Sequence, residues 1–102
     1  MLTSKQRAYL KSIASNEDTI LMVGKNNINK NILKQADDAL NARELIKGKV
    51  LETAEFDVKE MANQISDAIC AEVVQVIGNK FVLYRKNKLL NKIKLPKGNK
   101  VN

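Results

Sequence analysis

The sequence predicts an α/β domain with a two-layer α-β-α-β-α-β-β arrangement, in which three helices pack on a mixed four-stranded sheet. Segments with helical spacing of apolar residues alternate along the chain with short β-branched runs. The last two runs are separated only by Gly78-Asn79, which suits a tight hairpin turn with glycine first. Because β-α-β crossings favour parallel neighbours and a hairpin is antiparallel, we expect both kinds of pairing in one sheet. The 102 residues, 44% of them hydrophobic, suffice for one core.

The first helix is predicted over residues 3–15. Thr3 and Gln6 have the spacing of a capping box, in which each side chain accepts a hydrogen bond from the other residue's backbone amide. An apolar stripe is made by Tyr9, Leu10, Ile13 and Ala14. The following run at 19–23 is continuous enough to predict a central strand.

Two further helices are predicted from the same kind of spacing. One covers 28–41, with Asn41 as its C-terminal cap. The other covers 57–70 and begins with Asp57 and Glu60, whose spacing repeats that of the first capping box. Its acidic residues fall on the outer face, away from its apolar stripe.

The second strand is predicted over 44–51, and its two faces differ in character. The face directed to the core carries Ile46, Gly48 and Val50. The opposite, exposed face brings Lys47 and Lys49 together. Glycine weakens a strand and is typical of a bulge, so we expect a bulge at Gly48.

The last two strands are predicted over 73–77 and 80–85, which are rich in β-branched and aromatic residues. A short edge pairing is expected over 93–95, where apolar residues alternate with lysines. We predict one domain over 1–96, up to the only proline, and a flexible basic tail over 97–102.

Positive charge is concentrated in particular segments, and the formal net charge is +7. Residues 1–79 carry ten Lys/Arg and eleven Asp/Glu, whereas 80–102 carry eight Lys/Arg and no acid. The segment 52–72 holds six acids and one base, while 5–11 and 25–34 are basic. This distribution predicts a polyanionic partner. The alternative is a lysine-rich surface that serves solubility.

The connection between the first strand and the second helix has the features of an anion-binding loop. Gly24 allows a tight turn, and Asn27 tolerates a left-handed conformation. The loop opens onto a helix N-terminus, where free amides and the helix dipole favour anions, and Lys25 adds an ammonium group. We interpret Gly24–Asn27 as a phosphate-binding element. The alternative is an ordinary strand-to-helix turn.

The residue types that most enzymes use are missing. The chain has no histidine and a single cysteine, Cys70, which excludes His-containing catalytic triads and the usual zinc ligand sets. We predict a non-enzymatic protein without metal or cofactor, with Cys70 as a small core residue. No stretch suits a signal peptide or approaches the roughly 20 apolar residues that span a bilayer, so we predict no membrane association and a cytoplasmic location.

Four segments together resemble the CRM domain (chloroplast RNA splicing and ribosome maturation), in its stand-alone bacterial YhbY-type form. They are Leu2–Leu10, Val23–Asn26, Ala39–Lys47 and Val76–Arg85. The resemblance implies a fold similar to the C-terminal domain of translation initiation factor three and RNA binding through a GxxG loop comparable to that of KH modules. It also implies association with precursors of the large ribosomal subunit. Asn27 stands where the family has the second glycine.

We therefore expect a monomer that binds RNA of a large-subunit precursor particle, mainly through backbone phosphates. The predicted contacts are Gly24, Lys25, Asn26, Asn27, Lys5, Arg7, Lys11, Lys30, Lys34, Lys47, Lys49, Arg85 and Lys86. Tyr9 and Tyr84 are the candidates for base stacking, with packing as the alternative. The competing hypothesis is a protein-interaction module whose acidic third helix docks a basic ribosomal protein.

Overall fold

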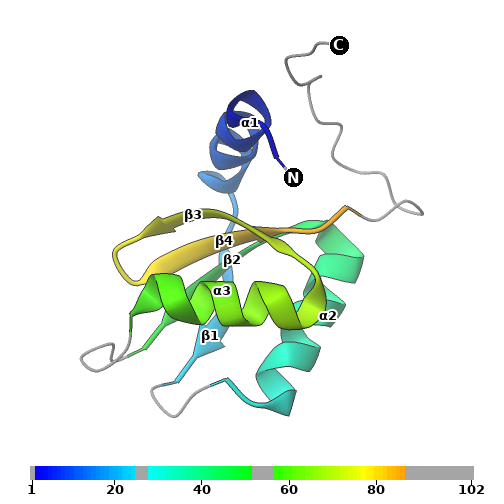
Figure 1. Ribbon diagram of the computed structural model, residues 1–102, viewed down its shortest axis with the longest axis vertical. Helices are drawn as coiled ribbons and strands as arrows, with labels where there is room; N and C mark the ends of the chain where they lie inside the picture. The colour runs from blue at the N-terminus through cyan, green and yellow to red at the C-terminus, as the bar shows by residue number, and fades with distance from the viewer. Residues whose placement is uncertain (1, 25–27, 52–56, 87–102) are drawn as a thin grey trace.

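The computed structural model describes residues 2–24, 28–51 and 57–86. Its elements are α1 (Ser4–Ala14), β1 (Thr19–Val23), α2 (Lys30–Arg43), β2 (Leu45–Val50), α3 (Val58–Ile69), β3 (Glu72–Ile77) and β4 (Lys80–Tyr84) (Figure 1). The predicted order of helices and strands is therefore confirmed. The pairing predicted over 93–95 and the tail over 97–102 lie outside the described residues.

The four strands form one mixed sheet in the order β1-β2-β4-β3. β1 runs parallel to β2, and β4 pairs antiparallel with both β2 and β3. The mixed sheet is confirmed, but among the described strands β1 lies at an edge, because the β3–β4 hairpin supplies the second neighbour of β2. The apolar run of β1 reflects burial on one face only: Leu21 and Val23 are buried, whereas Met22 between them is 51% exposed.

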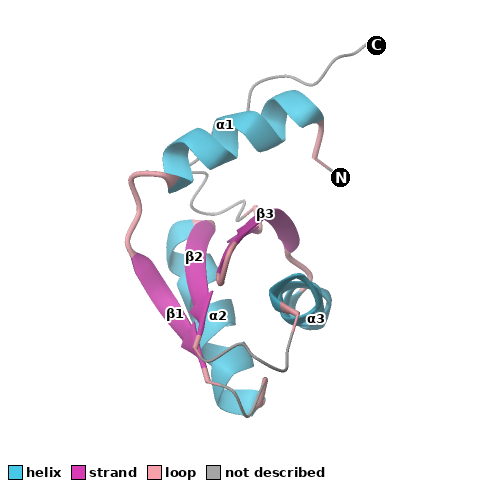
Figure 2. Ribbon diagram, turned by 90° about the vertical axis from the view of Figure 1, so that its left-hand side faces the viewer, coloured by secondary structure: helices cyan, strands magenta, loops and turns pink. Residues whose placement is uncertain are grey.

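The helices cover the two faces of the sheet unequally. On one face α2 and α3 enclose the larger core cluster, which includes Leu21, Leu40, Ile46, Ile65, Phe81 and Leu83. On the opposite face α1 encloses a smaller cluster of Leu10, Ala14, Leu45, Val74, Val82 and Tyr84. Figures 1 and 2 show α1 lying apart from the other two helices, at one end of the sheet. The predicted two-layer description thus holds for α2 and α3, and α1 adds a partial third layer.

The predicted caps of α1 and α3 are present. The hydroxyl of Thr3 accepts from the Gln6 amide at 3.1 Å, and the Gln6 side chain accepts from the Thr3 amide at 3.0 Å, which completes the capping box. At α3 the carboxylate of Asp57 accepts from the amide of Lys59 at 2.9 Å, so its partner is not Glu60 as predicted. Both helices therefore begin where the sequence places their first turn.

The ends of α2 and α3 differ from the prediction. α2 begins at residue 30, because the side chain of Asn29 accepts from the amide of Ile32 at 2.9 Å. It ends with Glu44 in the left-handed conformation at φ 66°, beyond the cap predicted at Asn41. Cys70 ends α3 in the same way, at φ 58°. This turn carries Cys70 away from the buried stripe, and the cysteine is exposed, not a core residue.

Gly48 makes room for an aromatic ring. An ideal Cβ at this position would lie 2.4 Å from Cζ of Phe81, so the ring occupies the space that a side chain would need. The bulge predicted at Gly48 is instead found in the neighbouring β1, between Thr19 and Leu21. No helix in the described part of the chain is long and apolar enough to cross a bilayer.

Candidate nucleic-acid interface

The half of the sheet that α1 leaves uncovered presents a surface that we call the open face. It consists of Met22, Lys47, Lys49, Gln75, Ile77, Lys80 and Val82. Its outer row crosses all four strands, since Met22 is paired with Lys49, Lys49 with Lys80, and Lys80 with Ile77. Its inner row runs from Lys47 through Val82 to Gln75 and lies next to α1. Cross-strand partners point to the same side of a sheet, so these side chains share one surface.

Three lysines crowd the middle of the open face. Lys49 and Lys80 are direct antiparallel partners, and Lys47 lies two residues before Lys49 on the same side. Like charges placed directly opposite each other destabilise a sheet. None of the three forms an ion pair with another described residue. Among the described residues, the positive charge of the open face is therefore uncompensated, and an anionic ligand would neutralise it.

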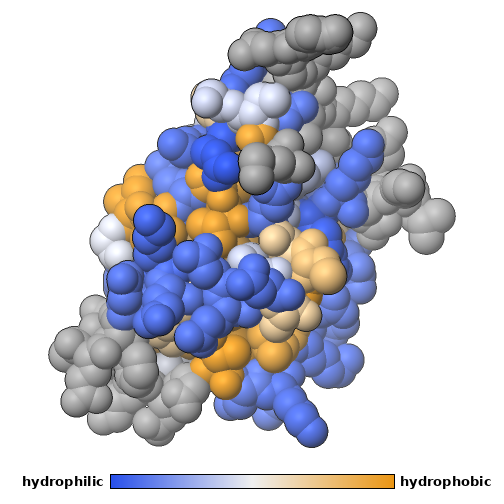
Figure 3. Space-filling model, viewed as in Figure 1, coloured by the Kyte–Doolittle hydropathy of each residue, from blue (hydrophilic) through white to orange (hydrophobic). Residues whose placement is uncertain are grey.

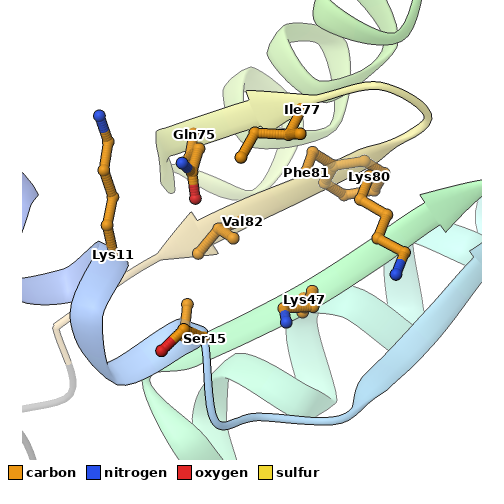
Figure 4. A pocket seen from close by; sticks show the side chains of 9 residues that line it. Lys11, Ser15, Lys47, Gln75, Ile77, Lys80, Phe81 and Val82 are labelled. Atoms are coloured by element: carbon orange, nitrogen blue, oxygen red, sulfur yellow. The ribbon is translucent and has the colours of Figure 1, made fainter.

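A groove of about 390 Å³ lies between the open face and the last turn of α1. Figure 4 shows Val82 at its centre, with Gln75 and Ile77 of β3 on one side and Lys47 of β2 on the other. Val82 is only 4% exposed, so the floor of the groove is part of the packed core. Three lysines, Lys11, Lys47 and Lys80, line the groove around this floor.

The predicted phosphate-binding loop starts at the edge of the same surface. Gly24 follows β1 directly, two residues after Met22 of the outer row. It is exposed, and nothing lies within 4 Å of an ideal Cβ built on it. The other three loop residues, Lys25, Asn26 and Asn27, lie outside the described residues. The open face and the first residue of the loop are thus neighbours on one side of the molecule.

The remaining predicted lysines are exposed but do not gather at one place. Lys5 and Lys11 belong to α1, and of these only Lys11 lines the groove. Lys30 and Lys34 belong to α2, which covers the other face of the sheet, and Lys34 forms an exposed ion pair of 3.4 Å with Asp38. Lys86 follows β4 and is exposed. The described site therefore centres on the lysines of the sheet, with one from α1.

Arg7 and Arg85, both predicted RNA contacts, form hydrogen bonds within the fold. The guanidinium group of Arg7 donates to the carbonyl oxygens of Val73 and Val74, which ties α1 to β3. The guanidinium group of Arg85 donates to the carboxylate of Asp37 at 2.6 Å. It also donates to the carbonyl oxygen of Ile69 at 2.8 Å and to the side chain of Asn41 at 2.9 Å. Through these hydrogen bonds, both arginines join elements that are distant in the sequence.

Lys80 is absent from the predicted contacts, although it lies at the centre of the open face. The available signal was the two-residue turn at Gly78-Asn79, which sets the register of β3 and β4 and so places Lys80 beside Ile77. Tyr84, a predicted stacking candidate, is buried beneath α1 and packs in the core, whereas Tyr9 is 40% exposed. Burial raises the pKa of the Tyr84 hydroxyl above its ordinary value of 10.0, with a smaller contribution from nearby carboxylates.

A second, shallower surface follows β3 between α1 and α3. Figure 3 shows hydrophobic side chains gathered over this strand, next to the hydrophilic surface of α3. A groove of about 510 Å³ runs along residues 73–77, with Arg7 and Lys11 on the α1 side and Lys59 and Asn63 on the α3 side. Positive side chains therefore border β3 on both sides.

The fold and the open face together define a small mixed α/β domain with a basic sheet surface. A protein of the same fold is SAV1595 from Staphylococcus aureus, known from a solution structure. It matches with a TM-score of 0.81 and 50% sequence identity over 94% of this chain and 100% of that chain. The family model of the CRS1/YhbY (CRM) domain matches residues 2–85. The chain therefore belongs to the CRM domain family, and the resemblance read from the sequence is confirmed.

Two relatives carry names that state an activity. The chain is 43% identical over 96 residues to the probable RNA-binding protein YqeI of Bacillus subtilis, covering 94% of this chain and 100% of that protein. It is 37% identical over 97 residues to an RNA-binding protein of Haemophilus influenzae, covering 94% of this chain and 96% of that protein. The similarity extends over nearly the whole length of each relative.

Proposed function

We propose that this protein is a non-enzymatic RNA-binding protein that contacts the RNA backbone through the open face. The observation that carries this proposal is the direct pairing of Lys49 with Lys80, beside Lys47, without an acidic partner among the described residues. A sheet gains nothing in stability from such an arrangement, whereas phosphate groups would neutralise it. The names of the two relatives and membership of the CRM family support RNA as the polyanion.

The predicted loop extends the proposed interface beyond the sheet. Gly24 leads from the edge of the open face into residues 25–27, where backbone amides and Lys25 would grip a further phosphate. Lys11 would contact the backbone from the side of α1. Lys25→Ala is expected to weaken RNA binding, and an unchanged affinity would remove the loop from the interface.

A matched pair of variants tests the open face. Lys49→Gln removes one charge from its centre, and Lys34→Gln removes one charge from α2, which covers the other face of the sheet. We expect Lys49→Gln to weaken RNA binding several-fold and to lower the salt dependence of the binding constant by the amount that corresponds to about one phosphate contact. The control Lys34→Gln should have a smaller effect on both quantities. Equal losses for the two variants would mean that net charge, not the open face, determines binding.

We further propose that the RNA belongs to a precursor of the large ribosomal subunit in the cytoplasm, as the family resemblance implies. Sedimentation of a cell extract at low and high salt tests this proposal. The protein should migrate with large-subunit particles at low salt and leave them at high salt, because phosphate contacts weaken as counterion concentration rises. A protein that stays at the top of both gradients would have a different RNA target.

The competing hypothesis of a protein-interaction module is favoured by one feature, the exposed acids of α3. Glu60 and Asp67 are both exposed on this helix. If α3 docks a basic ribosomal protein, Glu60→Lys with Asp67→Lys should abolish particle association and leave binding to purified RNA intact. If the Lys49→Gln variant loses particle association and the variant with Glu60→Lys and Asp67→Lys keeps it, RNA is supported as the main partner.

A further inference from the structure

The groove between α1 and the open face differs from the rest of the basic surface in its chemistry. Its floor is apolar and buried, because Val82 and Ala14 are 4% and 2% exposed. Three lysines surround that floor, from α1, β2 and β4. A phosphate group alone needs only positive charge and hydrogen-bond donors. A groove that combines lysines with apolar side chains therefore suits a ligand that also has a flat, weakly hydrated part.

We propose that this groove binds one unpaired nucleotide, whose base enters the groove beside Val82 and Ile77 and whose flanking phosphates meet the three lysines. This inference rests on the proposed RNA binding and specifies the form of RNA that is bound. The volume of about 390 Å³ falls in the range of roughly 300–1,000 Å³ that is usual for small-ligand pockets. Ile77, which is 62% exposed, provides a further aliphatic contact at the side of the groove.

Gln75 supplies the polar group that would recognise the edge of the base. Its side chain enters the groove beside Val82 (Figure 4), and its amide forms no hydrogen bond with another described residue. An amide offers donors and an acceptor together, which suits the edge of a nucleobase. The other uncharged polar group that lines the groove is the hydroxyl of Ser15, which already donates to the carbonyl oxygen of Ser12 at 2.8 Å. Gln75 is therefore the main candidate for hydrogen bonding to the base.

A paired base could not occupy this groove. In an A-form duplex the bases stay stacked inside the helix, and the deep, narrow major groove excludes side chains. Flipping a base out of a duplex costs a few kcal/mol. The geometry thus favours single-stranded segments, loops and bulges over continuous duplex, although a duplex offers more phosphates to the lysines.

The experiment compares one fluorescent RNA strand of mixed sequence, alone and annealed to its complement, at the same salt concentration. We expect the wild-type protein to bind the single strand at least about tenfold more tightly. Gln75→Leu should weaken single-strand binding at least about fivefold and leave duplex binding unchanged, because only the unpaired base reaches the amide. Gln64→Leu, the same change on the exposed surface of α3, is the matched control and should alter neither affinity.

Side-chain amide resonances provide a second measurement. Addition of the single strand should shift the amide signals of Gln75 and leave those of Gln64 in place. Equal affinities for the two RNA forms, or a Gln75→Leu variant that loses both equally, would overturn the nucleotide site while RNA binding stands. If neither form binds, the proposed function itself fails.

Discussion

The two faces of the sheet are supplied by the same strands but differ in how they are used. β2 shows the contrast most clearly: Ile46, Gly48 and Val50 are all buried towards α2 and α3. On its other side Leu45 is buried beneath α1, whereas Lys47 and Lys49 are only partly covered. One face of the sheet, the closed face, is thus covered along the whole of β2, whereas the other changes from buried core to a partly exposed basic surface within a few residues.

This difference indicates how the domain stays stable while one face of its sheet carries lysines that repel each other. The closed face contributes apolar burial along all its strands, so the open face can hold like charges that weaken it locally. α1 marks the boundary between the buried part and the exposed part of this second face. Its buried residues pack on one end of the face, and its last turn lines the groove. The following predictions test this division, starting with the largest expected effect.

Leu10→Ala should cost about 3 kcal/mol of unfolding free energy, since it leaves a cavity under α1 at a fully buried position. Leu40→Ala, equally buried under α2, should cost a similar amount. Urea unfolding measures both. The two variants should differ in RNA affinity at a temperature where both are folded: only Leu10→Ala disturbs the helix that lines the groove. Equal RNA affinities would mean that α1 contributes nothing to the interface.

Gly48→Ala should destabilise the closed face by about 1–3 kcal/mol, because the new methyl group would overlap the ring of Phe81. Chemical denaturation of the variant would give this value. The control is Gly24→Ala, where nothing lies within 4 Å of the added carbon and the stability should change by less than about 0.5 kcal/mol. A Gly48→Ala variant as stable as the wild type would show that the ring can move aside.

Tyr84→Phe should stabilise the protein by about 1 kcal/mol at neutral pH, because the buried hydroxyl has no hydrogen-bond partner among the described residues. Its pKa is raised above 10.0 by burial and then by Glu44 and Glu72, so above pH 10 the unfolded chain loses this proton before the folded one does. The wild type should therefore lose stability as the pH rises beyond 10, and the variant should lose less. Urea midpoints at neutral and alkaline pH measure the effect.

Tyr9→Phe is the control for this substitution, since it removes a hydroxyl from an exposed position. It should change the stability at neutral pH by less than Tyr84→Phe does. A destabilised Tyr84→Phe variant would mean that the hydroxyl makes a contact that stabilises the core.

Lys49→Gln should raise stability by about 0.2–1 kcal/mol, because it removes a like-charge pair with Lys80. The same substitution is expected to weaken RNA binding, so the two effects have opposite signs. Thermal unfolding at low salt, where the repulsion is largest, gives the stability change. A loss of stability would contradict the idea that the open face carries an energetic cost.

Local features of the fold could be predicted from the sequence, because they depend on neighbours in the chain. The capping box of Thr3 and Gln6 and the exposure of Lys47 and Lys49 follow from spacing alone. The edge position of β1 could not be predicted, since the order of strands depends on where the later hairpin pairs.

The candidate site was harder to predict for the same reason. Nothing in the spacing distinguishes Arg7 and Arg85, which join distant elements, from the lysines of the open face, which form no ion pair with another described residue. Lys80 joins Lys49 only through the register of β2 and β4. The resemblance to the CRM family predicted the class of protein, and strand spacing predicted Lys47 and Lys49, whereas the addition of Lys80 to the open face required the three-dimensional structure.

The contact of Arg7 with β3 has a consequence for the behaviour of the protein in concentrated solution. β3 lies at an edge of the sheet that the described residues form, and an edge offers backbone groups to which a strand of another molecule can pair. The guanidinium group takes up two consecutive carbonyl oxygens there, at the point where the strand is irregular. Lys11 and Lys59 border the same edge and would repel an identical copy. We therefore expect these basic side chains to disfavour the pairing of β3 with an identical copy.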